Sequence, residues 1–125
     1  MLAALFILLS SLVQSSEYSL QFSKVDNRVN VFVGDSLIFD SETIDNSPGL
    51  KFDVNLSAYV DDSNQKVKVV LYNGHPPYSV HQVDPIWELR FELFRGKEEL
   101  DFFYEYGDNN ALGKVVELEI DLNNY

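Results

Sequence analysis

The chain has 125 residues, of which 46% are hydrophobic and 14% aromatic, so it can form one domain with a substantial core. Its formal net charge of -11 argues against nucleic acid or an anionic membrane surface as a partner. It contains no cysteine, so a folded secreted form would depend on core packing without disulfide bonds.

The first 15 residues form an apolar segment that ends in small polar residues, the pattern of a secretory signal peptide. The apolar run is shorter than the roughly 20 residues that a membrane-spanning helix needs. No Lys or Arg precedes it, so a truncated start or a first β-strand remain alternative interpretations. Val13 and Ser15 occupy the small-residue positions of a cleavage site. We therefore predict a secreted protein with a single domain over residues 16–125 and no stable membrane span.

From Glu17 onward the apolar residues recur at every second position, which is the spacing of half-buried β-strands. Short alternating segments are separated by turn-rich segments, and the only helix expected is a single turn near residues 57–60. This pattern predicts an all-β fold, a two-sheet antiparallel β-sandwich or jelly roll of about eight strands. The alternating residues, in chain order, are Tyr18, Leu20 and Phe22; Val29, Val31 and Val33; Leu37 and Phe39; Phe52, Val54 and Leu56; Val67, Val69 and Leu71; Trp87, Leu89, Phe91 and Leu93; Leu100, Phe102, Tyr104 and Tyr106; and Val116, Leu118, Ile120 and Leu122.

The segment VFVGDSLIFDS, residues 31–41, contains the letters GDSL, which surround the nucleophilic serine in a family of lipases and esterases. That chemistry needs the motif at a strand-to-helix turn and a histidine base from an Asp-x-x-His motif. Here an alternating apolar pattern follows Ser36, and no Asp stands three residues before His75 or His81. We therefore predict a β-hairpin and no catalytic residues.

Two turn geometries fit this hairpin. A two-residue loop of Gly34 and Asp35 has the residue order of a type II′ turn, but it would place Val33 opposite Ser36. A three-residue loop keeps apolar side chains on a common face and is favoured by the pattern. It would pair Val33 with Leu37, Val31 with Phe39, and Phe32 with Ile38.

The hairpin is followed by an FDVNLSAYV segment and a KVKVVLYN segment. This order resembles the jelly-roll sugar-binding-type domains of β-galactosidase-related glycosidases, in which a V-x-V-N-G hairpin precedes F-D-V-T-x-Y-L and N-x-V-x-V-x-V-x-N strands. The resemblance covers residues 29–73 and implies a galactose-binding-like β-sandwich. It carries over no ligand residues, because the shared letters are structural, and Gly-Asp replaces the usual Asn-Gly turn.

The loop at residues 73–85 contains both histidines and three of the four prolines, and Trp87 follows it. Long loops on rigid sandwiches often carry function, and prolines lower the entropy lost when a loop is ordered by a ligand. A carbohydrate could stack on Tyr78 and Trp87, and the predicted hydroxyl partners are His75, His81, Gln82 and Asp84. The alternative is a stiff crossover between the sheets, with Trp87 in the core.

No cofactor is predicted, and calcium is the metal that the loops would fit best. Asp and Asn oxygens are hard ligands, but these residues also favour turns for backbone reasons, and neither candidate set has EF-hand spacing. A transition-metal site of His75, His81 and Asp84 would use a histidine spacing that fits no common pattern. The two calcium candidates are Asp61, Asp62 and Asn64, and Asp108, Asn109 and Asn110.

Two further strands meet across the turn at Gly96. Their apolar pattern predicts a register with Leu93 opposite Phe102 and Arg90 opposite Glu105. The paired carboxylates Glu98 and Glu99, and likewise Glu117 and Glu119, are predicted to be solvent-exposed charges rather than catalytic pairs.

The leading hypothesis is a secreted, non-catalytic β-sandwich that binds carbohydrate through its end loops. The alternative is a protein-interaction or structural module that acts through an exposed strand edge or an apolar patch. Such a patch would consist of the residues opposite the main alternation, namely Phe32, Ile38, Phe94 and Phe103. An enzyme is not predicted, because no set of nucleophile, base and orienting residue can be assembled.

Overall fold

The computed structural model describes residues 17–44, 49–79 and 81–125. The predicted signal peptide, residues 1–15, and the expected start near Ser16 lie outside the described residues. No helix of the described part is long and apolar enough to cross a membrane. The described elements are β1 (Tyr18–Asp26), β2 (Arg28–Val33), β3 (Ser36–Asp40), β4 (Phe52–Asn55), β5 (Lys66–Asn73), β6 (Trp87–Arg95), β7 (Glu98–Gly107), β8 (Gly113–Asp121) and a short 3₁₀ helix, η1 (Leu122–Asn124).

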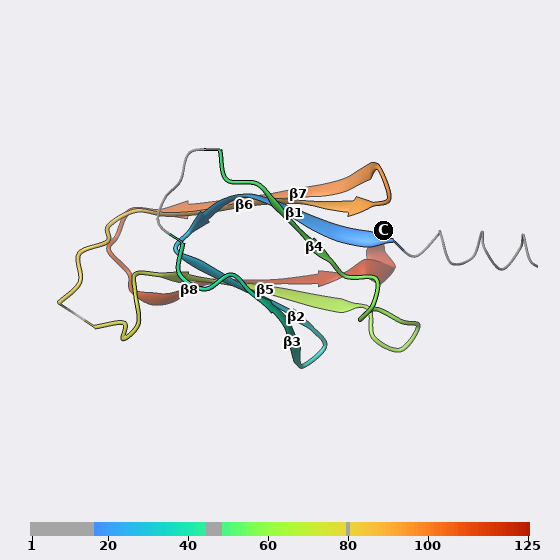
Figure 1. The fold of residues 1–125 in the computed structure, drawn as a ribbon, viewed down its shortest axis with the longest axis horizontal. Helices are drawn as coiled ribbons and strands as arrows, with labels where there is room; N and C mark the ends of the chain where they lie inside the picture. Colours follow the sequence, from blue (N-terminus) through green and yellow to red (C-terminus); the bar gives the residue numbers. More distant parts are fainter. Residues whose placement is uncertain (1–16, 45–48, 80) are drawn as a thin grey trace, which may run out of the picture.

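The strands form two four-stranded antiparallel sheets. The first, which we call sheet A, has the order β4-β1-β6-β7, and the second, sheet B, has the order β3-β2-β5-β8. Figure 1 shows them as two layers, with β1, β6 and β7 in one and β2, β5 and β8 in the other. The predicted all-β sandwich of about eight strands is confirmed.

The core lies between the layers because alternate side chains of both sheets point inward. Leu20, Phe22 and Phe91 are completely buried. The ring of Phe22 lies 5.0 Å from the ring centroid of Phe91, and 5.1 Å from that of Phe52 on β4. These aromatic contacts join three neighbouring strands of sheet A on its inner face.

The GDSL segment forms the predicted β-hairpin, but the predicted three-residue loop is wrong. Val33 pairs with Ser36, so the loop consists of Gly34 and Asp35 alone. Gly34 has φ +58° and lies against Asn64, so a side chain at this position would be strained and crowded. The register shifts between Val31 and Phe32, so Phe32 pairs with Leu37 and not with Ile38. This β-bulge restores the predicted pairing of Val31 with Phe39. The hairpin therefore combines a two-residue turn with the apolar pairing expected of the longer loop.

The predicted register between β6 and β7 is wrong by one residue. Phe102 pairs with Glu92, and Arg90 pairs with Tyr104. Because side chains alternate between faces, a slip of one residue exchanges the inner and outer rows of a strand. Phe103, expected outside, stacks on the core residue Phe91 with a centroid distance of 4.7 Å.

The four residues of the predicted apolar patch do not come together. Phe32 and Ile38 belong to sheet B, whereas Phe94 and Phe103 belong to sheet A. Ile38 and Phe103 pack against the core. These four residues therefore do not form the exposed apolar patch that was predicted.

Candidate functional site

Three aromatic side chains project from the outer face of β7, and we call them the aromatic strip. Phe102, Tyr104 and Tyr106 keep 48%, 44% and 68% of their surface exposed. They occupy alternate positions of one strand, so their side chains lie on the same face. Because β7 is at the edge of sheet A, the strip is open along one side.

The outer face of β6 holds these rings in place. The hydroxyl of Tyr104 donates a hydrogen bond to the Glu88 carboxylate, and this bond raises the pKa of Tyr104. The Arg90 guanidinium lies 5.2 Å from the ring centroid of Phe102, a cation–π distance. The rings of Tyr104 and Tyr106 are 5.9 Å apart. The strip is therefore a set of positioned rings rather than three independent surface residues.

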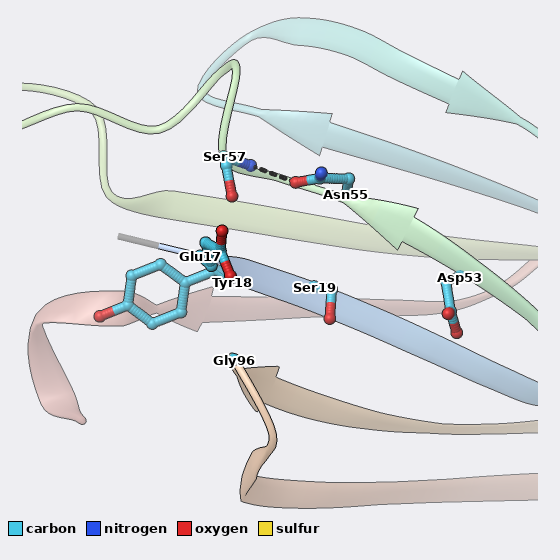
Figure 2. Close-up of a pocket in the computed structure, with 7 residues that line it drawn as sticks. All are labelled: Glu17, Tyr18, Ser19, Asp53, Asn55, Ser57 and Gly96. Carbon is cyan, nitrogen blue, oxygen red and sulfur yellow. Dashed lines mark hydrogen bonds between the residues drawn. The ribbon is translucent and has the colours of Figure 1, made fainter. Parts of the chain in front are cut away.

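A polar pocket of about 270 Å³ opens at the end of sheet A where β1 begins. Figure 2 shows that its walls come from the start of β1, from β4 and the residues just after it, and from the turn between β6 and β7. The Oδ1 atom of Asn55 accepts a hydrogen bond from the Ser57 amide at 2.9 Å. The Ser57 hydroxyl is buried and has no hydrogen-bond partner among the described residues. The residues that line the pocket are Glu17, Tyr18, Ser19, Asp53, Asn55, Ser57 and Gly96.

The pocket and the aromatic strip share one face of the molecule. A row of paired residues crosses all four strands of sheet A, from Asp53 through Gln21 and Glu92 to Phe102. Gln21 Nε2 donates to Asp53 Oδ1 at 3.1 Å, which orders the start of this row. The outer face of sheet A thus places polar groups at one side and aromatic rings at the other.

Carboxylates cluster where β1 and β6 meet the 74–86 loop. Burial and, to a smaller extent, the negative charges of Asp84 and Glu88 raise the pKa of Asp26 from 3.8 to about 6, whereas the charge of His75 acts to lower it. Lys24 Nζ lies 3.8 Å from Glu88, which balances part of this charge. Glu88 therefore links the acidic cluster to Tyr104 of the strip.

The loop predicted from the sequence lies at the other end of the sandwich from the Figure 2 pocket, as Figure 1 shows. Its Gln82 side chain accepts a hydrogen bond from the His75 amide at 2.8 Å and donates one to the Pro77 carbonyl at 2.6 Å. The Tyr78 ring stacks on Tyr72 at 5.7 Å. The Gln82 amide is thus engaged within the loop itself.

The other predicted ligand residues are divided between surface and core. His75 and His81 are exposed, and the Asp84 backbone is held by the side chains of Asn73 and Asn110. Trp87 is only 9% exposed and packs in the core, as the alternative interpretation expected. Of the predicted set, Tyr78 alone lines the cavity of about 370 Å³ described at this end of the sandwich, together with Ser79, Asn110 and Leu112. The loop site stays a prediction.

In the two predicted calcium loops, the side-chain oxygens of Asp61, Asn109 and Asn110 each accept a hydrogen bond from a backbone amide. Asp61 Oδ1 accepts hydrogen bonds from the Ser63 amide at 2.9 Å and the Ser63 hydroxyl at 2.8 Å, which lowers the pKa of Asp61. Asp61 also pairs with Asn64 in a short β-bridge, and exposed Asp62 lies in the turn between them. In the second loop, Asn109 Oδ1 accepts from the Ala111 amide. Across the described ranges, no three His, Cys, Asp or Glu side chains gather as a group that could hold a metal ion.

Comparison with protein-family models, curated proteins and solved structures finds no match for this chain. The resemblance to galactose-binding-like domains therefore stays a prediction. The case for a function has to come from the geometry of the molecule itself.

Sequence reasoning missed the aromatic strip because it assigned Phe102, Tyr104 and Tyr106 to the core row. The composition of this row could have indicated an exposed position, because it contains two tyrosines, whose hydroxyls need hydrogen-bond partners when buried. The opposite row contains Phe103 between Asp101 and Glu105, which looks like an outward row until the contact with Phe91 is known.

Proposed function

We propose that this chain is a non-catalytic carbohydrate-binding module whose ligand surface is the outer face of sheet A. The observation that carries the proposal is the aromatic strip of Phe102, Tyr104 and Tyr106, exposed and positioned by Glu88 and Arg90. The C–H face of a sugar ring is apolar and can pack on an aromatic ring, while its hydroxyls need polar partners around the rim. This face supplies both kinds of contact.

The polar partners lie beside the strip. Gln21, Glu92 and Arg90 occupy outward positions of β1 and β6, within the rows that pair with β7. Amides, carboxylates and guanidinium groups are the side chains that hydrogen-bond to hydroxyls. The pocket of about 270 Å³ is close to the ~300 Å³ lower limit of ligand sites, so it suits a single sugar unit.

This proposal moves the ligand from the end loop to the sheet face. A site at the loop would require Tyr78, whereas a site on the sheet requires Tyr104 and Tyr106. Substitution of these tyrosines separates the two locations, because Tyr78 and the strip belong to different parts of the chain.

The test is binding of the full chain to a broad glycan array, followed by calorimetry with any glycan that binds. The double variant Tyr104→Ala/Tyr106→Ala should weaken binding at least about tenfold. Tyr59→Ala is the matched control, because Tyr59 is 49% exposed but lies outside sheet A. A blank array from folded protein, or binding that survives the double variant, would refute the proposal; loss in Tyr78→Ala alone would return the site to the loop.

A second candidate function follows from the free edge of β7. Among the described strands β7 pairs only with β6, so its other edge could accept a strand from a protein partner. Glu98, Glu99, Asp101 and Glu105 place charges along this edge, a common protection against strand addition. Carbohydrate is therefore favoured. A protein partner that protects the outer β7 amides from hydrogen exchange, and still binds the Tyr104→Ala/Tyr106→Ala variant, would reverse this preference.

We also propose that the module acts outside the cytoplasm, because the pattern of residues 1–15 is that of a signal peptide. N-terminal sequencing of protein recovered from the growth medium of its host tests this. A start near Ser16 is expected, and full-length protein found only within cells would contradict it.

A further inference from the structure

The outer face of sheet A carries more acidic than basic side chains. Lys24 and Arg90 are the two basic residues at its outward positions in the described part of the chain. Lys24 lies 3.8 Å from Glu88, and Arg90 stacks on Phe102, so both are already engaged. The acidic residues at outward positions are Asp26, Asp53, Glu88, Glu92 and Glu99.

Two of these carboxylates lie beside the aromatic strip on neighbouring strands. Glu92 is the strand partner of Phe102, and Glu99 is the strand partner of Phe94. The two residues are therefore diagonal neighbours on the outer face, and a side-chain hydrogen bond with Glu92, together with burial and the negative charge of Glu92, raises the pKa of Glu99. Neither makes an ion pair with a cation of the described residues. A positive group on a ligand would relieve this repulsion.

The lining of the Figure 2 pocket is also acidic. Glu17 and Asp53 supply carboxylates to its lining, Ser19, Asn55 and Ser57 supply neutral polar groups, and no basic side chain lines it. The pocket and the strip, joined by the row from Asp53 to Phe102, therefore form one continuous acidic surface that also carries exposed aromatic rings.

Three classes of glycan can be compared on this surface. Glycans that carry carboxylates or sulfates would be repelled by the excess negative charge. Neutral glycans would stack on the rings and could donate hydroxyl hydrogen bonds to the carboxylate pair, but they would leave its negative charge uncompensated. Glycans with free amino groups would stack and also form charge-assisted hydrogen bonds to the carboxylates, which are stronger than neutral ones.

We propose that the outer face of sheet A binds a glycan whose sugar units carry free amino groups, with an ammonium group held by Glu92 and Glu99 while neighbouring sugar rings stack on the aromatic strip. This inference rests on the proposed carbohydrate-binding function and adds the class of glycan to it.

The test is calorimetry of the full chain with two tetramers of equal length and linkage, β-1,4-linked glucosamine and β-1,4-linked N-acetylglucosamine, at about pH 6, where the amino groups are protonated. The glucosamine tetramer should bind at least about tenfold more tightly, the size of effect expected from a charge-assisted hydrogen bond. The variant Glu92→Gln/Glu99→Gln should lose this preference and bind the two tetramers with similar affinity.

The matched control is Glu117→Gln/Glu119→Gln, which makes the same change in net charge on β8 of sheet B. It should retain the preference for the glucosamine tetramer. An equal loss in both double variants would show attraction by overall charge only and would overturn the inference. So would a preference that persists in Glu92→Gln/Glu99→Gln.

The two proposals fail in different ways. If acetylated or neutral glycans bind through Tyr104 and Tyr106 as tightly as the glucosamine tetramer does, the amino-sugar inference is wrong and the carbohydrate-binding function stands. If neither tetramer nor any array glycan binds to protein shown by circular dichroism to be folded, both are wrong.

Discussion

The hydroxyl of Tyr104 on β7 donates a hydrogen bond to the carboxylate of Glu88 on β6. The two residues are diagonal neighbours on the outer face of sheet A, because Glu88 pairs with Tyr106 and Tyr104 pairs with Arg90. Glu88 also attracts Lys24 from β1, at 3.8 Å. The middle ring of the aromatic strip is thus tied to two neighbouring strands, which limits its rotation before any ligand arrives.

This contact predicts different effects for two substitutions of Tyr104. Tyr104→Phe keeps the ring and removes the bond to Glu88, so glycan affinity should fall only about two- to threefold, from reduced positioning. Tyr104→Ala removes the stacking surface and should reduce affinity at least about tenfold. Calorimetry with one array-selected glycan measures both, with Tyr59→Phe as the control. Equal losses in Tyr104→Phe and Tyr104→Ala would show that the hydroxyl, not the ring, is the contact.

Gly107 should be intolerant of any side chain. A Cβ atom at this position would lie 2.4 Å from the Trp87 ring, too close for any real contact. Gly107→Ala should therefore lower the free energy of unfolding by about 1–3 kcal/mol, as overpacking of a core does. Urea unfolding measures the change.

A double-mutant cycle with Trp87→Leu provides the control for this prediction. The smaller side chain removes the clash, so Gly107→Ala should be less destabilising in that background. The same loss in both backgrounds would show that contact with the Trp87 ring is not the cause.

Asp26 should make stability depend on pH. Its pKa is raised from 3.8 to about 6 in the fold, so the folded state favours the protonated form. The unfolded chain ionises first, and stability from this group is lost as pH rises from about 4 through about 6. Asp26→Asn cannot ionise, so it should be more stable than the parent at pH 7 by about 1 kcal/mol, after allowance for solvent screening of a half-buried carboxyl.

Thermal and urea unfolding of Asp26→Asn across this pH range provide the measurement. The advantage over the parent should shrink towards zero at pH values near and below 4, where the parent carboxyl is protonated in both states. Asp62→Asn, an exposed turn residue, controls for the loss of one negative charge. An advantage of Asp26→Asn that does not change with pH would show that ionisation of Asp26 is not responsible.

Ser36→Ala should leave the protein unchanged. Ser36 is an exposed residue at the start of β3, and the adjoining turn lies beside Lys66 at the beginning of β5. Both histidines follow Asn73 at the other end of that strand, roughly 20 Å away at the rise of a β-strand. The free energy of unfolding should change by less than about 0.5 kcal/mol, and hydrolysis of p-nitrophenyl esters should stay at the level of buffer. Hydrolysis by the parent that Ser36→Ala abolishes would restore the esterase interpretation.

The sequence by itself determined the class of fold and most of the core. Alternation of apolar residues with a period of two is a local property, so Leu20, Phe22, Val29, Val31, Leu89 and Phe91 could be assigned to the interior before the structure was known. The turn at Gly34 was predictable for the same reason, because glycine and aspartate favour reversal of the chain whatever surrounds them.

Only the tertiary structure decided which residues point into the core and which point outward on the bulged strands β3 and β7. The register shifts between Val31 and Phe32 and between Leu93 and Phe94 each insert one residue, and a single inserted residue moves every later side chain to the opposite face. Whether such a bulge forms depends on packing between distant segments, as in the stacking of Phe103 on Phe91. The aromatic strip lies outside for this reason.

The pocket also depended on the tertiary structure. Its lining comes from Ser19 on β1, Asp53 and Asn55 on β4, and Gly96 in a later turn. These residues are neighbours only because β1 pairs with β4 on one side and with β6 on the other. Local sequence carries no record of which strands pair, since that choice is made by burial of the whole core at once.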